Sequence, residues 1–229
     1  MTANTPILIS FSGMDGAGKS TQIEHLKNTA EQYGLKVEIF TFWDNVVVFS
    51  RYREGFVQKV LKSESGVGTP GKPVKRRDKN VRGWHLNLMR HILYGMDAMH
   101  LTAVIKKAKT RGVDVVVMDR YIHDELANLS LVNPLTRTYV RIVARLVPCP
   151  DIAFVLDADP ELAYARKPEY PLEFLREVRA AYINLANLLG TITVVPALSL
   201  TEAKRVIEIA FRRILHKRGV LNQRGTWAA

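Results

Sequence analysis

The sequence predicts an α/β fold: a single doubly wound domain in which a five-stranded parallel sheet is flanked by helices. Short apolar runs alternate with amphipathic stretches along the chain, and this alternation is typical of repeated strand–helix–strand units. The length of 229 residues suits one such domain. Because 47% of the residues are hydrophobic, the chain can also bury a sizeable core.

Five apolar runs bounded by turn-forming residues are the predicted strands. They cover residues 7–11, 36–42, 113–118, 152–156 and 192–195. The third run is apolar enough to lie at the centre of a parallel sheet. Ligands of such sheets bind beyond the carboxyl ends of the strands, so the chemically active side chains are expected where these runs end.

The predicted helices are stretches in which apolar residues recur every three or four positions. They cover residues 19–34, 84–109, 135–146, 172–189 and 199–216, with a short helix that begins at Pro160. Proline suits a first helical turn, and Ser-Leu-Thr-Glu at 199–202 resembles a capping box. For the long helix at 84–109 the pattern predicts a core face made by Met89, Ile92, Met96, Met99 and Ala103.

The stretch 63–82 lacks a clear period and is rich in glycine, proline and basic residues, so it predicts a mobile loop. Its basic part, 72–82, could close over an anionic substrate, bind nucleic acid or contact a partner, or it could be a solvated loop. These alternatives stay open. The tail 219–229 is expected to be loosely ordered, and the whole chain, 1–229, is expected to form one domain.

The charge balance is strongly basic, with 33 Lys and Arg against 22 Asp and Glu and a net charge of +11. Such an excess attracts nucleotides, nucleic acids or acidic membranes without choosing among them. No apolar run approaches the roughly 20 residues of a membrane span, so we expect a soluble protein without a membrane partner. The one cysteine, Cys149, excludes an internal disulfide and favours a cytoplasmic location.

A phosphate-binding motif follows the first predicted strand. Residues 13–20, Gly-Met-Asp-Gly-Ala-Gly-Lys-Ser, match G-x-x-x-x-G-K-[ST] in full, between an apolar strand and an amphipathic helix. Glycines let the backbone turn its N–H groups toward a phosphate, and the helix N-terminus adds partial positive charge. Lys19 would reach the β- and γ-phosphates of ATP, and Ser20 would offer its hydroxyl to Mg²⁺. The residues expected to bind ATP are Gly13, Gly16, Ala17, Gly18, Lys19, Ser20 and Thr21.

This motif indicates a P-loop NTPase fold but does not name the reaction. The guanine-recognition motif N-K-x-D and the L-S-G-G-Q signature of transport ATPases are both absent from the sequence. Asp119 and Arg120 follow the third predicted strand directly. That carboxylate is placed to hold Mg²⁺ or its waters, and the arginine to neutralise phosphate charge during transfer. A strand-end aspartate that caps a turn, beside a surface arginine, is the alternative.

With these motifs established, the chain resembles the thymidylate kinase family. Residues 11–21 are similar to that family's phosphate loop, and Asp-Arg-Tyr at 119–121 is similar to its D-R-[YFH] motif. Residues 150–161 resemble its fourth strand and the turn that leads into the lid. The order and spacing of these segments agree over most of the chain. The resemblance implies a nucleoside-monophosphate kinase that uses ATP and Mg²⁺.

The resemblance also implies roles for the substrate-binding positions. The acid at Asp15 would contact the sugar of the nucleoside monophosphate. Tyr94 takes the place of a phenylalanine that stacks on the base, although it could equally be a core tyrosine of the helix. Tyr121 belongs to the D-R-[YFH] motif and is expected at the substrate. Arg51 is a candidate for gripping the acceptor phosphate, with a solvated arginine as the alternative.

The lid and the metal site are assigned in the same way. The family uses the positions of Asp119 and Arg120 for the metal and the phosphates, so Ser20 and Asp119 are the expected Mg²⁺ ligands. Gly16 stands where some family loops carry an arginine, and such members take it from the lid. The short lid at 166–171 would then supply Arg166 as a catalytic arginine together with Lys19; a solvated helix end is the alternative.

Departures from the family pattern concentrate around the base. Ala98 replaces the arginine that reads the base, Ser12 replaces a glutamate, and Asp124 lies where a small serine is usual. An alanine cannot hydrogen-bond a base edge, so the acceptor base stays open. Three alternatives also stay open: a kinase of another small phosphorylated or hydroxyl acceptor, a non-catalytic nucleotide-binding regulator, and a nucleic-acid-associated ATPase. The sequence disfavours nucleic acid as a partner, because the basic loop lacks interleaved aromatics, and it leaves a homodimer open.

Overall fold

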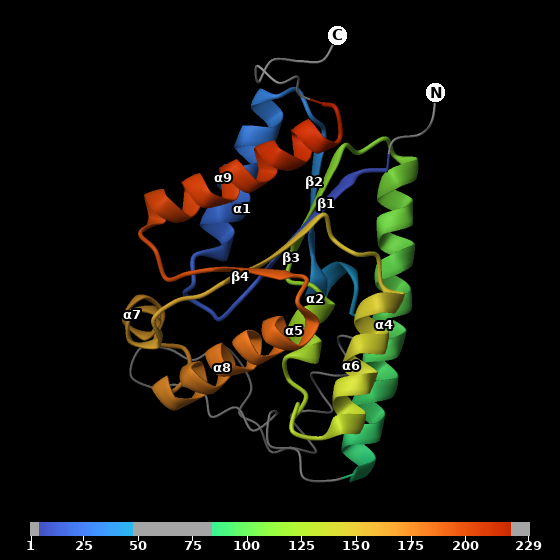
Figure 1. The fold of residues 1–229 in the computed structure, drawn as a ribbon, viewed down its shortest axis with the longest axis vertical. Helices are drawn as coiled ribbons and strands as arrows, with labels where there is room; N and C mark the ends of the chain where they lie inside the picture. Colours follow the sequence, from blue (N-terminus) through green and yellow to red (C-terminus); the bar gives the residue numbers. More distant parts are fainter. Residues whose placement is uncertain (1–4, 48–83, 221–229) are drawn as a thin grey trace.

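The computed structural model describes residues 5–47 and 84–220, and it has the predicted parallel sheet with helices on both faces (Figure 1). The strands are β1 (Ile7–Ser12), β2 (Val37–Thr41), β3 (Val115–Asp119), β4 (Ile152–Leu156) and β5 (Ile192–Val195). Three predictions lie outside the described residues: the basic loop at 63–82, Arg51, and the tail beyond residue 220.

The strand order is β2-β3-β1-β4-β5, and every neighbouring pair is parallel. The central strand β1 aligns Phe11 with Asp119 of β3 and Ser12 with Val155 of β4. The carboxyl ends of β1, β3 and β4 therefore meet at one edge of the sheet. The phosphate-binding motif and Asp119 are thus neighbours in space, as the sequence predicts.

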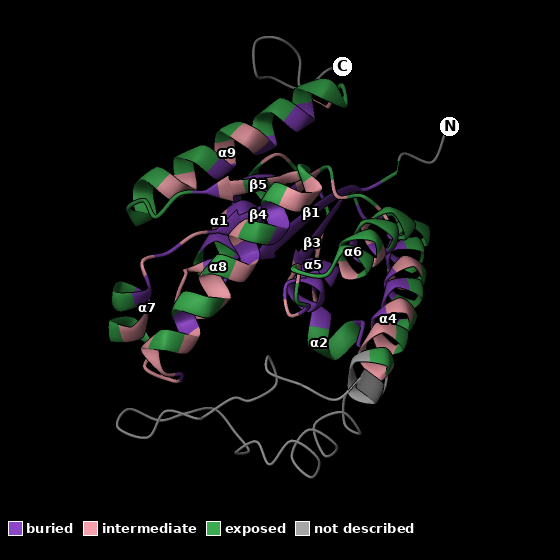
Figure 2. Cartoon of the chain, turned by 60° about the horizontal axis from the view of Figure 1, so that its bottom comes forward, coloured by how far each residue is buried: buried purple, intermediate pink, exposed green. Residues whose placement is uncertain are grey.

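The helices lie in two layers (Figures 1 and 2). Helices α1 and α9 cover one face of the sheet, and α4, α5, α6 and α8 cover the other. Their bounds, with those of the two short helices α2 and α7, are α1 (Lys19–Gln32), α2 (Phe42–Asn45), α4 (Trp84–Thr110), α5 (Ile122–Leu126), α6 (Pro134–Leu146), α7 (Pro160–Arg166), α8 (Leu172–Leu189) and α9 (Leu200–Lys217).

The capping box predicted for α9 is present. The Ser199 hydroxyl accepts a hydrogen bond from the backbone N–H of Glu202, and the Glu202 carboxylate accepts one from the N–H of Ser199. Two short helices were not predicted, because neither is long enough to show a period. One is α2, which begins at Phe42 where a strand end was expected, and the other is α5.

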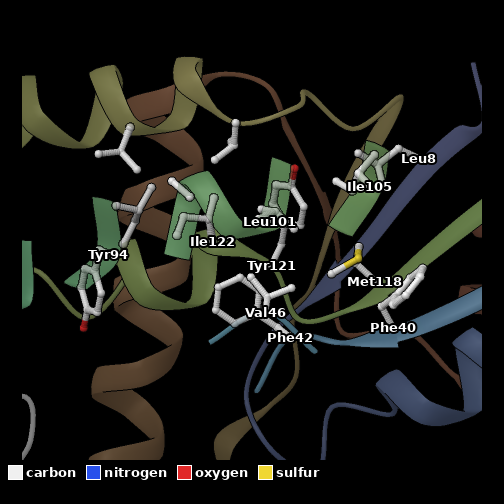
Figure 3. Close-up of a cluster of buried hydrophobic side chains, with 14 of the residues drawn as sticks. Leu8, Phe40, Phe42, Val46, Tyr94, Leu101, Ile105, Met118, Tyr121 and Ile122 are labelled. Atoms are coloured by element: carbon white, nitrogen blue, oxygen red, sulfur yellow. The ribbon is translucent and has the colours of Figure 1, made fainter. Parts of the chain in front are cut away.

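Each face of the sheet has its own apolar core. On the α1/α9 side the core includes Ile9, Phe11, Leu26 and Phe211. On the other side it includes Phe42, Leu101, Met118 and Ile122, which converge in Figure 3. The three central strands, β3, β1 and β4, are buried almost throughout, whereas the edge strands β2 and β5 are partly exposed. This buried sheet is the rigid base that holds the chemically active edge.

The core face predicted for α4 is wrong. Its buried apolar positions are Tyr94, Ala98, Leu101, Ile105 and Ala108, which step by three and four residues. By contrast, Ile92, Met96 and Met99 are 57%, 37% and 76% exposed. Both sides of this helix are apolar, so periodicity alone cannot tell which side faces the sheet. Among the described residues, no helix has the length and apolar character needed to cross a membrane.

Candidate active site

The phosphate loop joins β1 to α1 through glycines in left-handed backbone conformations. Gly13, Gly16 and Gly18 have φ angles of 138°, 84° and 87°, a region that side-chain-bearing residues enter only at a cost. A Cβ on Gly13 would lie 2.6 Å from the carbonyl oxygen of Leu156, and one on Gly16 would lie 2.9 Å from that of Ala163. The loop is therefore packed tightly against the end of β4 and against α7.

Lys19 is held inside this loop. Its side chain is 8% exposed, and its Nζ donates hydrogen bonds of 2.9 Å to the carbonyl oxygens of both Gly13 and Met14. Burial, reinforced by the charge of Arg120, lowers the pKa of Lys19 to about 8. At neutral pH the ammonium is still mostly charged, and Oδ1 of Asp15 lies 3.8 Å from its Nζ. A phosphate anion at this position would add a further negative partner.

Arg120 lies beside the loop in a left-handed conformation, with φ of 68°. Its backbone N–H donates to the carbonyl of Phe11 at 2.9 Å, so the turn after β3 is tied to β1. Its guanidinium is shared between two acids: Nη2 is 2.6 Å from Asp15 and Nη1 is 3.3 Å from Asp124. Burial alone would lower the pKa of Arg120, but the neighbouring acidic groups, Asp124 foremost, raise it above its usual range.

Asp119 and Ser20 offer the oxygen atoms that Mg²⁺ prefers. Asp119 ends β3, and burial raises the pKa of its carboxyl while the charges of Lys19 and Arg120 partly oppose that rise. Ser20 is exposed in the first turn of α1. Within the described ranges, no three or more His, Cys, Asp or Glu residues gather as a metal centre. Mg²⁺ bound with nucleotide phosphates needs only one or two protein oxygens, so these two residues fit it.

Arg166 reaches the loop from the end of α7. Its Nη1 donates a hydrogen bond of 3.3 Å to the carbonyl oxygen of Gly16. Helix α7 is in turn tied to α8, because Arg176 contacts Glu161 at 2.5 Å. The sequence prediction that a lid arginine approaches the phosphate loop agrees with this placement, while its catalytic part stays a prediction.

Two tyrosines predicted at the substrate lie in the core. Tyr94 is 5% exposed; its ring belongs to the apolar cluster of Figure 3, and its hydroxyl is 3.4 Å from Nε of Arg90. Tyr121 is fully buried, and its hydroxyl donates to the carbonyl of Pro148. These contacts give both rings a structural role. That the two tyrosines also bind the substrate stays a prediction.

Sequence reasoning missed a buried carboxylate next to the site. The sequence identifies Asp124 only as a departure from the family pattern near the base. In the structure its side chain is 4% exposed and faces Ser12 and Arg120, not Tyr94. Two departures from the family pattern, a serine at 12 and an acid at 124, could have indicated a contact between these positions. The Ser12 hydroxyl donates a hydrogen bond of 2.6 Å to Oδ2 of Asp124.

Sequence similarity to known proteins extends over most of the chain. The thymidylate kinase of Halothermothrix orenii is 29% identical over an alignment of 231 positions, which spans 92% of this chain and 95% of the relative. The probable thymidylate kinase of Sulfolobus acidocaldarius is 27% identical over 201 residues, covering 83% and 88%. That of Archaeoglobus fulgidus is 23% identical over 217 residues, covering 92% and 97%. The chain is a divergent relative of the thymidylate kinases.

This relationship covers nearly the full length of each relative, so it does not rest on the phosphate loop alone. No protein-family model matches the chain. Low identity and broad coverage together agree with a divergent thymidylate kinase-like fold. Of the departures from the family pattern, Ser12 and Asp124 lie next to Arg120, whereas Ala98 is buried in the core cluster that α4 joins.

Proposed function

We propose that the protein transfers the γ-phosphoryl group of ATP to a nucleoside monophosphate. The observation that carries this proposal is the convergence of Lys19, Arg120 and Arg166 on one glycine-rich loop. Three cations around a loop of this kind suit a polyphosphate and little else of comparable size. The similarity to thymidylate kinases supports the same class of reaction.

The chemistry asks the protein mainly for positioning and for charge neutralisation. The bond between the γ-phosphorus and the bridging oxygen of ATP breaks, and a new bond forms to a phosphate oxygen of the acceptor. That oxygen is already ionised near neutral pH, so no strong general base is required. Lys19 and Arg120 would stabilise the charge that spreads over the transferred group, and Arg166 would close over it.

Ser20 and Asp119 would hold Mg²⁺, which when bound would supply further positive charge to stabilise the transferred phosphoryl group. The lid at 166–171 would exclude water from the site. This matters because water can also accept the phosphoryl group and waste ATP. The contact of Arg166 with Gly16 supports a lid that closes on the loop itself.

The acceptor is proposed as a nucleoside monophosphate without a named base. Asp15, at the mouth of the loop, would contact its sugar. Thymidylate itself is the acceptor named for the relatives, but Ala98, where the resemblance places a base-reading arginine, has no side-chain group that can hydrogen-bond a thymine edge. A position without such a partner contributes nothing to base selection by hydrogen bonding.

A coupled assay of ADP release tests the proposal. Wild-type protein is given ATP, Mg²⁺ and each nucleoside monophosphate in turn, with Lys19→Ala as the inactive control. Release that depends on an acceptor supports the kinase. Tight ATP binding without acceptor-dependent release would instead identify a nucleotide-binding regulator. Release that depends on another small phosphorylated or hydroxyl compound would identify a different kinase, and stimulation by DNA or RNA an ATPase.

We also propose that a second copy of this chain packs on the exposed apolar stripe of α4. Leu88, Ile92, Met96 and Met99 form this stripe and are 54%, 57%, 37% and 76% exposed. Their three- and four-residue spacing makes one continuous row, which suits pairing of the helix with its own copy. Light scattering should give a dimer that Met99→Lys dissociates and Val206→Lys, on α9, does not. A monomeric wild-type protein would exclude it.

The location of the protein is proposed from the sequence. A single cysteine, exposed and without a disulfide in the structure, fits the reducing cytoplasm. Fractionation of cells that express the protein would test this.

A further inference from the structure

Asp124 is a buried carboxylate with four hydrogen-bond donors around it. Its Oδ2 accepts from Ser12 Oγ at 2.6 Å and from the backbone N–H of Tyr121 at 2.9 Å. Its Oδ1 accepts from the Tyr182 hydroxyl at 2.7 Å and from Nη1 of Arg120 at 3.3 Å. An ionised carboxylate offers about four lone-pair sites, so its capacity is filled. A carboxylate held from four directions is fixed in place.

These donors come from three different parts of the fold. Ser12 ends β1 and is fully buried, and Tyr182 lies on α8 and is 6% exposed. Tyr121 caps α5. Since β1 leads directly into the phosphate loop and α8 is tied to α7, which packs on that loop, Asp124 joins the elements that surround the site. Its partner Arg120 is the member of this group that also faces the loop.

The guanidinium of Arg120 has one inner and one outer contact. Nη1 faces Asp124, whose side chain is 4% exposed, whereas Nη2 faces Asp15, whose side chain is 28% exposed. A phosphate that reaches the loop can compete for the outer nitrogen, because Asp15 lies at the solvent side. It cannot displace Asp124, which is enclosed by protein. The inner contact therefore persists while the outer one exchanges.

We propose that Asp124 is the positioning residue for Arg120, anchoring one end of the guanidinium while the other end exchanges Asp15 for a nucleotide phosphate. This inference rests on the proposed function, since it assigns Arg120 to the phosphates. Asp124 itself touches no substrate. Its contribution passes through Arg120, whose other guanidinium contact, with the more exposed Asp15, is the one that exchanges.

A double-mutant cycle between Asp124→Asn and Arg120→Ala tests this inference. The quantities measured are the dissociation constant of MgATP by calorimetry and the kcat of acceptor-dependent ADP release. We expect Asp124→Asn alone to weaken MgATP binding about 5- to 10-fold and to lower kcat at least as much. In the Arg120→Ala background the same change should alter binding less than about 2-fold, because the residue through which it acts is gone.

Asp151→Asn is the matched control. Asp151 also pairs with an arginine, Arg218, and also accepts from a backbone N–H, that of Leu8, but it lies at the amino ends of the strands. The Asp151→Asn substitution should lower the free energy of unfolding without changing MgATP binding or kcat. Ser12→Ala removes one donor to Asp124 and keeps its charge, so it provides a milder variant if Asp124→Asn fails to fold. We expect a 2- to 5-fold loss of binding from it, again absent without Arg120.

The outcomes separate the two proposals. If wild-type protein binds MgATP but releases no ADP with any acceptor, the proposed function fails, and the cycle in binding still decides the role of Asp124. If the effects of Asp124→Asn and Arg120→Ala multiply, or if Asp124→Asn lowers only the melting temperature, Asp124 has a structural role and the inference is wrong.

Discussion

Nη2 of Arg120 and Oδ1 of Asp15 form an ion pair of 2.6 Å across the mouth of the phosphate loop. The two residues are 105 positions apart in the chain. This pair joins a residue assigned to the transferred phosphate with a residue assigned to the acceptor's sugar. Under the proposed function, an incoming polyphosphate would compete with Asp15 for the arginine, while the carboxylate of Asp15 keeps its 3.8 Å ion pair with Nζ of Lys19.

Replacement of Asp15 by asparagine should affect the two substrates in opposite directions. The Arg120 guanidinium loses a competing anion, so the dissociation constant of MgATP should fall about 2- to 5-fold, the size of a partly exposed charge interaction. The kcat/KM for the acceptor should fall at least about 10-fold, since a charge-assisted hydrogen bond to the sugar is lost. Calorimetry and steady-state kinetics measure the two effects. Weaker ATP binding in the variant would contradict this account of the pair.

Lys19→Met should separate binding from stability. MgATP binding should weaken at least about 10-fold, because a charge-assisted contact is worth about 1.5–3 kcal/mol. The melting temperature should change little, because the loss of the hydrogen bonds to Gly13 and Met14 is offset when methionine removes the cost of burying a charged amine. Lys27→Met, on the same helix but 37% exposed and paired only with Glu31 at 3.9 Å, is the control and should leave ATP binding unchanged. Equal effects of both substitutions would argue against a phosphate-binding Lys19.

Gly16→Ala should lower the free energy of unfolding more than the same substitution at another glycine with a positive φ angle. Gly190 has φ of 66° with open space around it, so Gly190→Ala carries only the backbone cost of roughly 1–2 kcal/mol. Gly16→Ala carries a similar cost and also drives a Cβ to 2.9 Å from the carbonyl of Ala163 on α7. Urea unfolding should show the larger loss for Gly16→Ala. Equal losses would mean that α7 does not pack on the loop in solution.

His123 should make the protein sensitive to mild acid. Its side chain is buried, and burial lowers its pKa to about 4, against partial opposition from Asp124. Between pH 4 and the ordinary value of about 6.5, the unfolded chain binds more protons at this residue than the folded chain. The contribution of His123 to stability is therefore lost as pH falls through that window, by roughly 2 kcal/mol between pH 7 and 4.5.

The measurement is the free energy of unfolding at several pH values, in wild-type protein and in His123→Gln. The wild-type protein should lose more stability than the variant between pH 7 and 4.5. Parallel pH profiles would show that His123 is protonated in the folded state or is exposed there.

Local patterns in the sequence are enough to predict the sheet, the phosphate loop and the place of Asp119. These depend on local signals: an apolar run, glycines at fixed spacing and a helix that begins at Lys19, all within about 25 residues of each other or at a strand end. Parallel strands bring their carboxyl ends to one edge, so Asp119 had to lie near the loop once its strand was recognised.

The side of α4 that faces the core and the surroundings of Arg120 follow from long-range packing. The helix is apolar on two sides, and it packs against α5 and α6 with the side that carries Tyr94 and Leu101. The side that carries Ile92 and Met99 stays exposed. Two of the four hydrogen-bond partners of Asp124, Ser12 and Tyr182, lie 112 and 58 positions away along the chain. Contacts at such separations leave no periodic trace in the sequence, because they depend on how whole elements are placed and not on the spacing within any one of them.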